Sequence, residues 1–278
     1  MKIIIEGKMK KTLKKKVEKK KIKEDEKKIV ETKVIENGIE RISTGIEGLD
    51  EIIEGGYPKN SVILVSGGPG TGKTLFCLQY LYNGAKNGEF GIYLTFEEEP
   101  KDLKDAAKRV GIDLEATNKV KIIKIENIVD VPQIIKILEE EIKKNDAKRL
   151  VIDSISSLEI LASTFPSVGL DVSPIKLKEG YVITPQKEAI IRKFLYNLVK
   201  YLRSLKVTTI LTSEAQNEKY SRSGVIEFIA DGVIKLSAEA VGNVLERNLF
   251  VVKMRKTKIE GGSYRISIEK GGIRIVER

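Results

Sequence analysis

One eight-residue motif constrains the fold of this 278-residue chain more than any other feature of its sequence. Residues 67–74 match the pattern G-x-x-x-x-G-K-[ST], in which glycines let backbone N–H groups curve around phosphate oxygens. The apolar run 62–66 before the motif predicts a strand, and the residues after it predict a helix over about 73–87. In this strand–loop–helix context the motif binds the phosphates of a nucleotide. The predicted nucleotide-binding residues are Gly67, Gly68, Pro69, Gly70, Thr71, Gly72, Lys73 and Thr74.

The motif also predicts a chemical role for its last two residues. Lys73 is expected to neutralise the β- and γ-phosphates of ATP, and the Thr74 hydroxyl is expected to coordinate Mg²⁺. A second metal-orienting carboxylate is expected at the end of another strand, and the apolar run Leu150–Ile152 ends at Asp153. Thr74 and Asp153 are therefore the candidate metal ligands. The alternative for Asp153 is an ordinary helix N-cap, because a strand that ends in Asp is often followed by a helix.

Two acids follow another predicted strand and are candidates for the group that activates water. Glu97 and Glu98 come directly after the run 91–96. Because the carboxyl ends of parallel strands converge on the ligand crevice, we expect at least one of these acids to face the γ-phosphate. The alternative is that Glu98 and Glu99 only begin the helix predicted at Pro100, where negative charge favours the helix dipole.

Strand-like and helical patterns alternate along the chain from about residue 39 onwards. Apolar runs predict buried strands, and apolar positions at helical spacing predict helices with one buried face; these segments are 62–66, 91–95, 120–123, 150–152 and 208–211 for strands, and 130–144 and 188–205 for helices. The C-terminal part differs, because its short strands have no helices between them: 232–237, 249–254, 264–268 and 273–276. The sequence therefore predicts an α/β fold with a mostly parallel central sheet, helices on both faces and a C-terminal antiparallel extension.

The residue types that are scarce exclude several classes of protein. One cysteine and no histidine exclude a disulfide within the chain, a Cys/His zinc cluster and a histidine-dependent nucleophilic triad. No window of about 18 residues is free of charge, so no membrane span is expected. The first residues lack the apolar segment of a signal peptide. We therefore expect a soluble, cytoplasmic protein.

The formal net charge of +10 is concentrated at the N-terminal end. Residues 1–33 hold 14 Lys and 6 acidic residues, a net +8, whereas the other 245 residues hold 36 basic and 34 acidic residues, a net +2. Such a run is expected to be solvated and flexible or weakly helical, with contact to nucleic acid or an anionic membrane surface as the alternative. The predicted divisions are a Lys-rich arm (1–38), a nucleotide-binding domain (39–278) and, within it, a Pro-containing inserted loop (162–187).

Several segments together resemble a known family, the KaiC/RadA branch of the RecA-type ATPases. They are the P-loop, Phe96-Glu97-Glu98 and Leu150-Val151-Ile152-Asp153-Ser154, with the lead-in 42–51 and the segment 206–214 also similar. The resemblance covers residues 39–278 as one KaiC-type domain and implies a RecA-like P-loop fold. It also implies that Glu97 activates water, with Glu98 assisting.

The resemblance further implies a pair of cations that act on a neighbouring subunit. In this family a Lys-x-Arg near the C-terminus reaches the nucleotide of the next subunit, and Lys253 and Arg255 fit that pattern. Such cations stabilise transition-state charge and count as part of the catalytic machinery. The alternative is two ordinary surface cations on an edge strand. A role in trans implies self-association, and the family commonly forms hexameric rings.

Three functions are compatible with these residues. The first is a ring-forming, Mg²⁺-dependent ATP hydrolase whose cycle drives a conformational or regulatory change. The second is a nucleotide-gated scaffold or regulatory protein with slow turnover. The third is a RadA-like recombination accessory protein that binds DNA, although the region 214–231 holds few basic residues and nucleic-acid contact is not evident. A protein partner is conceivable through the arm (1–38) or the inserted loop (162–187).

Overall fold

The computed structural model describes most of the chain after the Lys-rich arm. The described residues are 35–36, 38–126, 131–164, 175–176, 182–183, 187–215 and 220–277. The chain divides into two units, residues 1–35 and residues 36–278, and the fold below is that of the second unit. The predicted arm (1–38) lies almost wholly outside the described residues, so its conformation stays a prediction.

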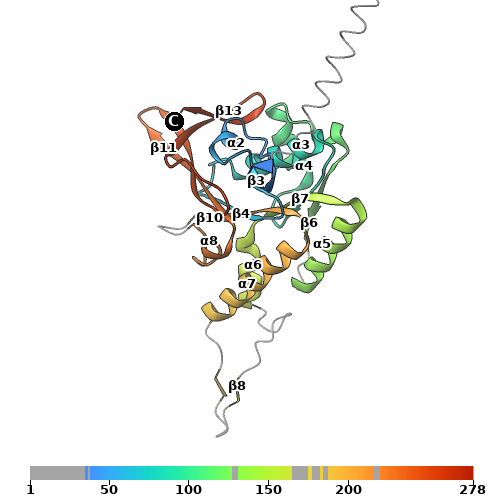
Figure 1. The fold of residues 1–278 in the computed structure, drawn as a ribbon. Coiled ribbons are helices and arrows are strands. Elements are labelled where there is room, and N and C mark those ends of the chain that lie inside the picture. Colours follow the sequence, from blue (N-terminus) through green and yellow to red (C-terminus); the bar gives the residue numbers. More distant parts are fainter. Residues whose placement is uncertain are drawn as a thin grey trace, which may run out of the picture. The chain divides into compact units, whose positions relative to one another are not determined.

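A nine-stranded sheet forms the centre of the molecule, in the order β14-β13-β12-β11-β4-β10-β7-β5-β6 (Figure 1). The strands are β4 (Val62–Gly67), β5 (Phe90–Thr95), β6 (Val120–Lys124), β7 (Ala147–Asp153), β10 (Thr208–Glu214), β11 (Gly232–Val241), β12 (Val244–Met254), β13 (Ser263–Glu269) and β14 (Gly272–Glu277). The six strands from β11 to β6 run parallel to one another, and β12, β13 and β14 extend the sheet in antiparallel fashion. The predicted α/β fold with its antiparallel extension is confirmed, but the segment 232–237, expected in that extension, belongs to β11 and runs parallel to β4.

Helices cover both faces of this sheet (Figure 1). One face packs against α3 (Lys73–Lys86) and α4 (Pro100–Arg109), and the other against α5 (Val131–Asn145), α6 (Ile155–Thr164) and α7 (Lys187–Ser204). The alternation of side chains along β4 shows why: Ile63 and Val65 belong to the first hydrophobic core, whereas Val62 and Leu64 belong to the second. A strand buried on both faces reads as a continuous apolar run, which is the pattern that predicted it.

The structure also describes shorter elements outside the central sheet. They are β1 (Ile35–Glu36), β2 (Ile39–Ile42), α2 (Leu49–Ile52), β3 (Tyr57–Pro58), the 3-10 turn η1 (Glu115–Thr117), β8 (Ile175–Lys176), β9 (Val182–Ile183) and α8 (Ile226–Ile229). β2 pairs with β3 in antiparallel fashion just before the P-loop strand. Within the predicted inserted loop (162–187), α6 continues to Thr164, β8 pairs with β9, and α7 begins at Lys187. The other residues of that loop lie outside the described ones.

Strand β7, which ends at the predicted metal ligand Asp153, is longer than its apolar run predicts. The run begins at Leu150, but β7 begins at Ala147 and includes Arg149, whose side chain is only 1% exposed. Arg149 pairs with Glu89 at 2.6 Å, and its guanidinium lies 4.5 Å from the centre of the Tyr80 ring. The buried, paired Arg149 therefore belongs to a strand that begins earlier than its apolar run indicates. Among the described helices, none is long and apolar enough to cross a membrane.

Candidate active site

The P-loop connects the end of β4 to the start of α3, as the motif predicts. Gly67 has no room for a side chain, because an added Cβ would lie 2.6 Å from the Leu236 carbonyl oxygen. Gly70 and Gly72 have φ of 74° and 101°, in the left-handed region that favours glycine. An added Cβ at Gly68 or Gly70 would meet no described atom within 4 Å, so both glycines border open space. The loop is thus tight against the sheet at Gly67 and leaves space at Gly68 and Gly70.

The lysine of the motif lies within this loop. The Lys73 ammonium donates to the carbonyl oxygens of Gly67 and Gly68, both at 2.9 Å. The Thr71 hydroxyl donates to the Gly68 carbonyl at 2.8 Å and so fixes the curve of the loop. Gly72 is the N-cap of α3, and no side chain caps that helix end. Backbone N–H groups and the helix dipole are therefore directed at the same place as the ammonium.

Asp153 ends β7 with its carboxylate held by hydroxyl groups from the two neighbouring strands. The Thr212 hydroxyl of β10 donates to Asp153 Oδ1 at 2.6 Å, and the Tyr93 hydroxyl of β5 donates to Oδ2. Burial, and then the nearby Asp153 charge, raise the pKa of Tyr93, so this phenol stays a donor at neutral pH. The peptide bond between Asp153 and Ser154 is cis. Two donors on opposite oxygens fix the orientation of the carboxylate.

The two acids after β5 lie at the same end of the sheet, and Glu98 is the one that touches the P-loop helix. The Thr74 hydroxyl donates to Glu98 Oε1 at 3.1 Å. Burial raises the pKa of Glu98, the charges of Asp153 and Glu97 raise it further, and the Thr74 bond opposes these effects. Glu97 Oε1 accepts from the Ser157 hydroxyl of α6 at 3.4 Å. The site therefore gathers three carboxylates beside the ammonium and the hydroxyl of the P-loop.

The alternative that the acids after β5 only begin the helix at Pro100 holds for Glu99. Glu99 is the N-cap of α4 and forms an ion pair with Lys124. Glu97 and Glu98 precede the cap, and their backbone N–H groups donate to the Thr95 hydroxyl at 3.3 and 3.1 Å. Their position is therefore set by the turn at the end of β5 and not by the helix.

The oxygen donors at this point suit Mg²⁺, which prefers hard oxygen ligands and keeps several waters. Thr74 supplies a hydroxyl and Glu98 a carboxylate that accepts a bond from it. Asp153 supplies a second carboxylate, close enough for its charge to raise the pKa of Glu98. Across the described ranges, no three His, Cys, Asp or Glu side chains are grouped as a metal cage. A metal at this site would therefore depend on phosphate oxygens from a nucleotide, as Mg²⁺ commonly does.

Lys253 and Arg255 lie away from the P-loop of their own chain. Lys253 pairs with Val233 and Val233 with Leu64, three positions before Gly67, which is about 10 Å along the strand. The Lys253 ammonium donates to the carbonyl oxygens of residues 227, 228 and 230 at 3.1, 3.1 and 2.7 Å. Burial, and then the Arg255 charge, lower the pKa of Lys253. Both cations donate to the Phe228 carbonyl, and the hydrogen bonds of the described residues do not connect either of them to the P-loop.

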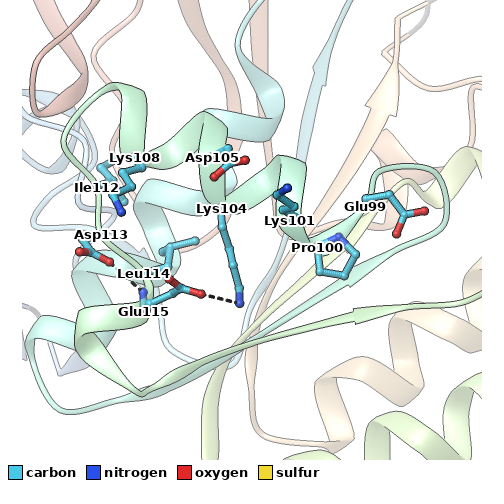
Figure 2. A pocket seen from close by; sticks show the side chains of 10 residues that line it. All are labelled: Glu99, Pro100, Lys101, Lys104, Asp105, Lys108, Ile112, Asp113, Leu114 and Glu115. Atoms are coloured by element: carbon cyan, nitrogen blue, oxygen red, sulfur yellow. Dashed lines mark hydrogen bonds and ion pairs between the residues drawn. The ribbon is translucent and has the colours of Figure 1, made fainter.

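A groove of about 560 Å³ runs along α4, next to the site but separate from it (Figure 2). Its wall includes Glu99 but none of the predicted catalytic, nucleotide-binding or metal residues; it is lined by Glu99, Pro100, Lys101, Lys104, Asp105, Lys108, Ile112, Asp113, Leu114 and Glu115. Figure 2 shows the Lys104 side chain directed at Glu115, with which it forms an ion pair at 2.9 Å. This mixed-charge groove is not the phosphate site.

Several residues that contact the site are not among those predicted from the sequence. Tyr93 and Thr212 hold Asp153, Ser157 contacts Glu97, and Arg247 of β12 donates from Nε to the Gly70 carbonyl at 3.3 Å. A sequence signal exists for Thr212, because it lies near the carboxyl end of a predicted parallel strand, where polar side chains face the ligand crevice. Arg247 lies on a hairpin strand and carries no comparable signal.

Comparison with known proteins places this site in a family. The model of the family described as the KaiC ATPase matches residues 42–166 and 179–278. The unmatched stretch, 167–178, falls inside the predicted inserted loop (162–187). The match therefore includes the P-loop, both acids after β5, Asp153 and the two C-terminal cations.

Individual relatives agree with this family. A UPF0273 protein of Thermotoga maritima is 31% identical over 240 residues, which cover 79% of this chain and 88% of that protein. The circadian clock oscillator protein KaiC of Picosynechococcus is 33% identical over 253 residues, which cover 86% of this chain but 45% of KaiC. Among solved structures, a KaiC-like protein of the archaeon Pyrococcus horikoshii superposes with a TM-score of 0.70 at 35% identity, over 86% of this chain and 99% of that chain.

Proposed function

The chain belongs to the KaiC ATPase family, and from this premise we propose that it hydrolyses ATP with Mg²⁺ at subunit interfaces of a ring-shaped homo-oligomer. The observation that carries the proposal is the meeting of Lys73, Thr74, Glu98 and Asp153 at the carboxyl ends of three parallel strands. A phosphate-binding loop, oxygen ligands for a metal and a carboxylate for water are together what phosphoryl transfer to water needs.

In this proposal the P-loop residues bind and orient the triphosphate. Lys73 exchanges its bonds to the Gly67 and Gly68 carbonyls for bonds to the β- and γ-phosphates. Thr74 and Asp153 hold the metal, and Mg²⁺ when bound withdraws charge from the phosphate oxygens. Tyr93 and Thr212 keep the Asp153 carboxylate in the orientation that this needs.

Glu97 and Glu98, which follow β5, have different roles in this proposal. Glu97 is exposed at the end of its strand, and within the described part of the chain its carboxylate accepts one long bond, from Ser157 at 3.4 Å, so it is available to take a proton from water. Glu98 is bonded to Thr74 and orients the metal side of the site. We assign Glu97 as the general base and Glu98 as its assistant.

Assembly follows from the placement of the two cations. The Arg255 side chain is 49% exposed and the neighbouring Phe228 is 74% exposed, and arginine and aromatic residues are enriched at protein interfaces. Because Lys253 and Arg255 do not reach the P-loop of their own chain, the site is complete only when a second subunit supplies them. A head-to-tail contact of this kind closes into a ring when its rotation allows, and six subunits is the number that the family resemblance implies.

One observation favours the slow-turnover alternative. All three donors of the Lys253 ammonium are bonded to carbonyl oxygens of its own chain, so this cation must leave those bonds before it can act on a neighbour. A protein that keeps the cation there would bind ATP and hydrolyse it slowly. The DNA-binding alternative depends on the Lys-rich arm (1–38), most of which lies outside the described residues.

Steady-state ATP turnover separates these possibilities. Lys73→Ala should abolish nucleotide binding and turnover, and Glu97→Gln should keep binding but lose turnover by about 10²–10⁴-fold. Lys86→Ala, an exposed lysine at the far end of the same helix, is the matched control and should behave as the wild type. A wild-type rate no higher than that of Glu97→Gln would favour the scaffold. Unchanged hydrolysis in Lys73→Ala would exclude the proposed site.

A further inference from the structure

Arg41 is a fully buried cation whose bonds join two segments that are distant in the sequence. Its side chain on β2 is 1% exposed, and it forms one ion pair, with Glu54 at 2.7 Å. On one side its guanidinium donates to the carbonyl oxygens of Ile53 and Gly56 at 3.3 and 3.1 Å. Charge is seldom buried unless most of its donors are satisfied, and here most acceptors are backbone oxygens. Arg41 therefore fixes the main chain of whatever it contacts.

The second segment that Arg41 contacts comes directly after the predicted trans cation. The guanidinium donates to the Lys256 carbonyl at 3.0 Å and to the Thr257 hydroxyl at 2.8 Å. Lys256 has a φ of 58°, so the chain turns sharply at this point. On the other side of the turn, the Arg255 N–H donates to the Asp231 carbonyl at 2.8 Å. The backbone of Arg255 is thus held from both sides, by Asp231 before the turn and by Arg41 after it.

The Arg255 side chain itself is held only loosely within the chain. It is 49% exposed, lies 3.6 Å from Asp231 and donates to the Phe228 carbonyl at 3.3 Å. The direction in which its guanidinium leaves the surface is therefore set mainly by the backbone turn. A displacement of about 1 Å in a group that acts on a transition state can cost about 10²-fold in rate.

We infer that Arg41 is a positioning residue for the trans cation: it locks the turn 255–257 so that Arg255 reaches the nucleotide of the next subunit. This inference rests on the trans role under the proposed function. The planar guanidinium suits the task, because its two terminal nitrogens reach both segments at once, which a single ammonium cannot reproduce. Arg41 touches neither nucleotide nor metal and acts only through Arg255.

A mixed-oligomer assay tests the inference. Arg41→Lys keeps a positive charge near Glu54 but loses the pair of terminal nitrogens that bond to both segments. We expect it to lower turnover about 10–100-fold while the affinity of its own P-loop for ATP changes less than about twofold. Co-assembly with Lys73→Ala subunits, which retain an intact Arg41 and Arg255, should restore turnover, because the P-loop of the Arg41→Lys subunit then faces a correctly held Arg255. A residue that only stabilised its own subunit would not be rescued in this way.

Arg149→Lys is the matched control. Arg149 is equally buried, pairs with one carboxylate and donates to the carbonyl oxygens of Ser43 and Tyr80 at 2.9 and 2.8 Å, but it does not contact the turn 255–257. This variant is expected to lower thermal stability, and co-assembly with Lys73→Ala should not raise its turnover per folded subunit. If Arg41→Lys fails to fold, Thr257→Val removes the hydroxyl that accepts from Arg41 and donates to the Arg255 carbonyl at 3.3 Å, and it should show a smaller loss with the same rescue.

The outcomes separate this inference from the proposal on which it rests. Rescue of Arg255→Ala by Lys73→Ala subunits without rescue of Arg41→Lys or Thr257→Val would overturn the positioning role alone. Absence of rescue for all of them, Arg255→Ala included, would overturn the trans role and this inference with it. Full turnover in both Arg41→Lys and Thr257→Val would also overturn the positioning role.

Discussion

The hydroxyl of Tyr93 offers a direct test of how the metal-side carboxylate is held. Tyr93 is fully buried on β5, and its phenol donates to one oxygen of Asp153 while Thr212 donates to the other. Tyr93→Phe removes this donor and leaves the ring packing in place. The Asp153 carboxylate then keeps one of its two positioning bonds, and its orientation toward the metal is less restricted.

Two independent arguments give a similar size for the expected loss of metal affinity. A hydrogen bond to a charged group contributes about 1.5–3 kcal/mol, which corresponds to about 10–150-fold in an equilibrium constant. Loss of an outer partner of a metal ligand typically costs about 10–100-fold in metal affinity or activity. We therefore expect the Mg²⁺ concentration that gives half-maximal ATP turnover to rise by at least about tenfold.

Tyr80→Phe is the matched control for this variant. Tyr80 is also fully buried, and its hydroxyl donates to the Thr208 carbonyl at 3.1 Å, away from Asp153. It should lower the free energy of unfolding by about 0.5–1.5 kcal/mol and leave the Mg²⁺ dependence of turnover unchanged. The assay is a Mg²⁺ titration of turnover at saturating ATP. The same Mg²⁺ concentration at half-maximal turnover for the wild type, Tyr93→Phe and Tyr80→Phe would refute the role assigned to Asp153 and its two donors.

Three further predictions concern stability and assembly. Gly84→Ala should destabilise the fold by about 1–3 kcal/mol in urea denaturation, because its Cβ would lie 2.3 Å from Arg149 Nε, whereas Gly261→Ala, with no atom within 4 Å, should change little. Burial raises the pKa of Glu159 in the folded state. The protonated carboxyl therefore contributes fully to the free energy of unfolding below its unfolded pKa of about 4.3, and this contribution is lost as pH rises through the raised pKa. Glu159→Gln should flatten this part of the pH dependence of the unfolding midpoint, and an unaltered profile would count against the assignment. Phe228→Ala should leave the free energy of unfolding within about 0.5 kcal/mol but weaken self-association in light scattering, since its ring is 74% exposed; equal association would argue against an interface there.

The parts of the fold that the sequence predicts well are those that a short stretch of residues determines. Apolar runs of three to five residues locate five of the parallel strands, and the P-loop motif fixes the turn between β4 and α3. The meeting of Glu98, Asp153 and Thr74 is also predictable, because parallel strands bring their carboxyl ends to one edge.

The parts that escape prediction depend on which strands become neighbours. Tyr93 and Thr212 reach Asp153 because β7 lies between β5 and β10, and the order of strands in a sheet is not written in any local pattern. Arg41 and Arg149 escape for a different reason. Hydropathy assigns arginine to the surface, whereas both are buried with carboxylate partners that come from distant segments.

Turnover in mixed oligomers tests the central claim, that each site is built from two subunits. Lys73→Ala has intact trans cations and a defective P-loop, and Arg255→Ala has the reverse, so each alone should be nearly inactive. In a one-to-one mixture, about one quarter of the interfaces of a head-to-tail ring pair an intact P-loop with an intact Arg255. We therefore expect about a quarter of wild-type turnover per subunit to return on mixing. A mixture that stays as inactive as its components would contradict it.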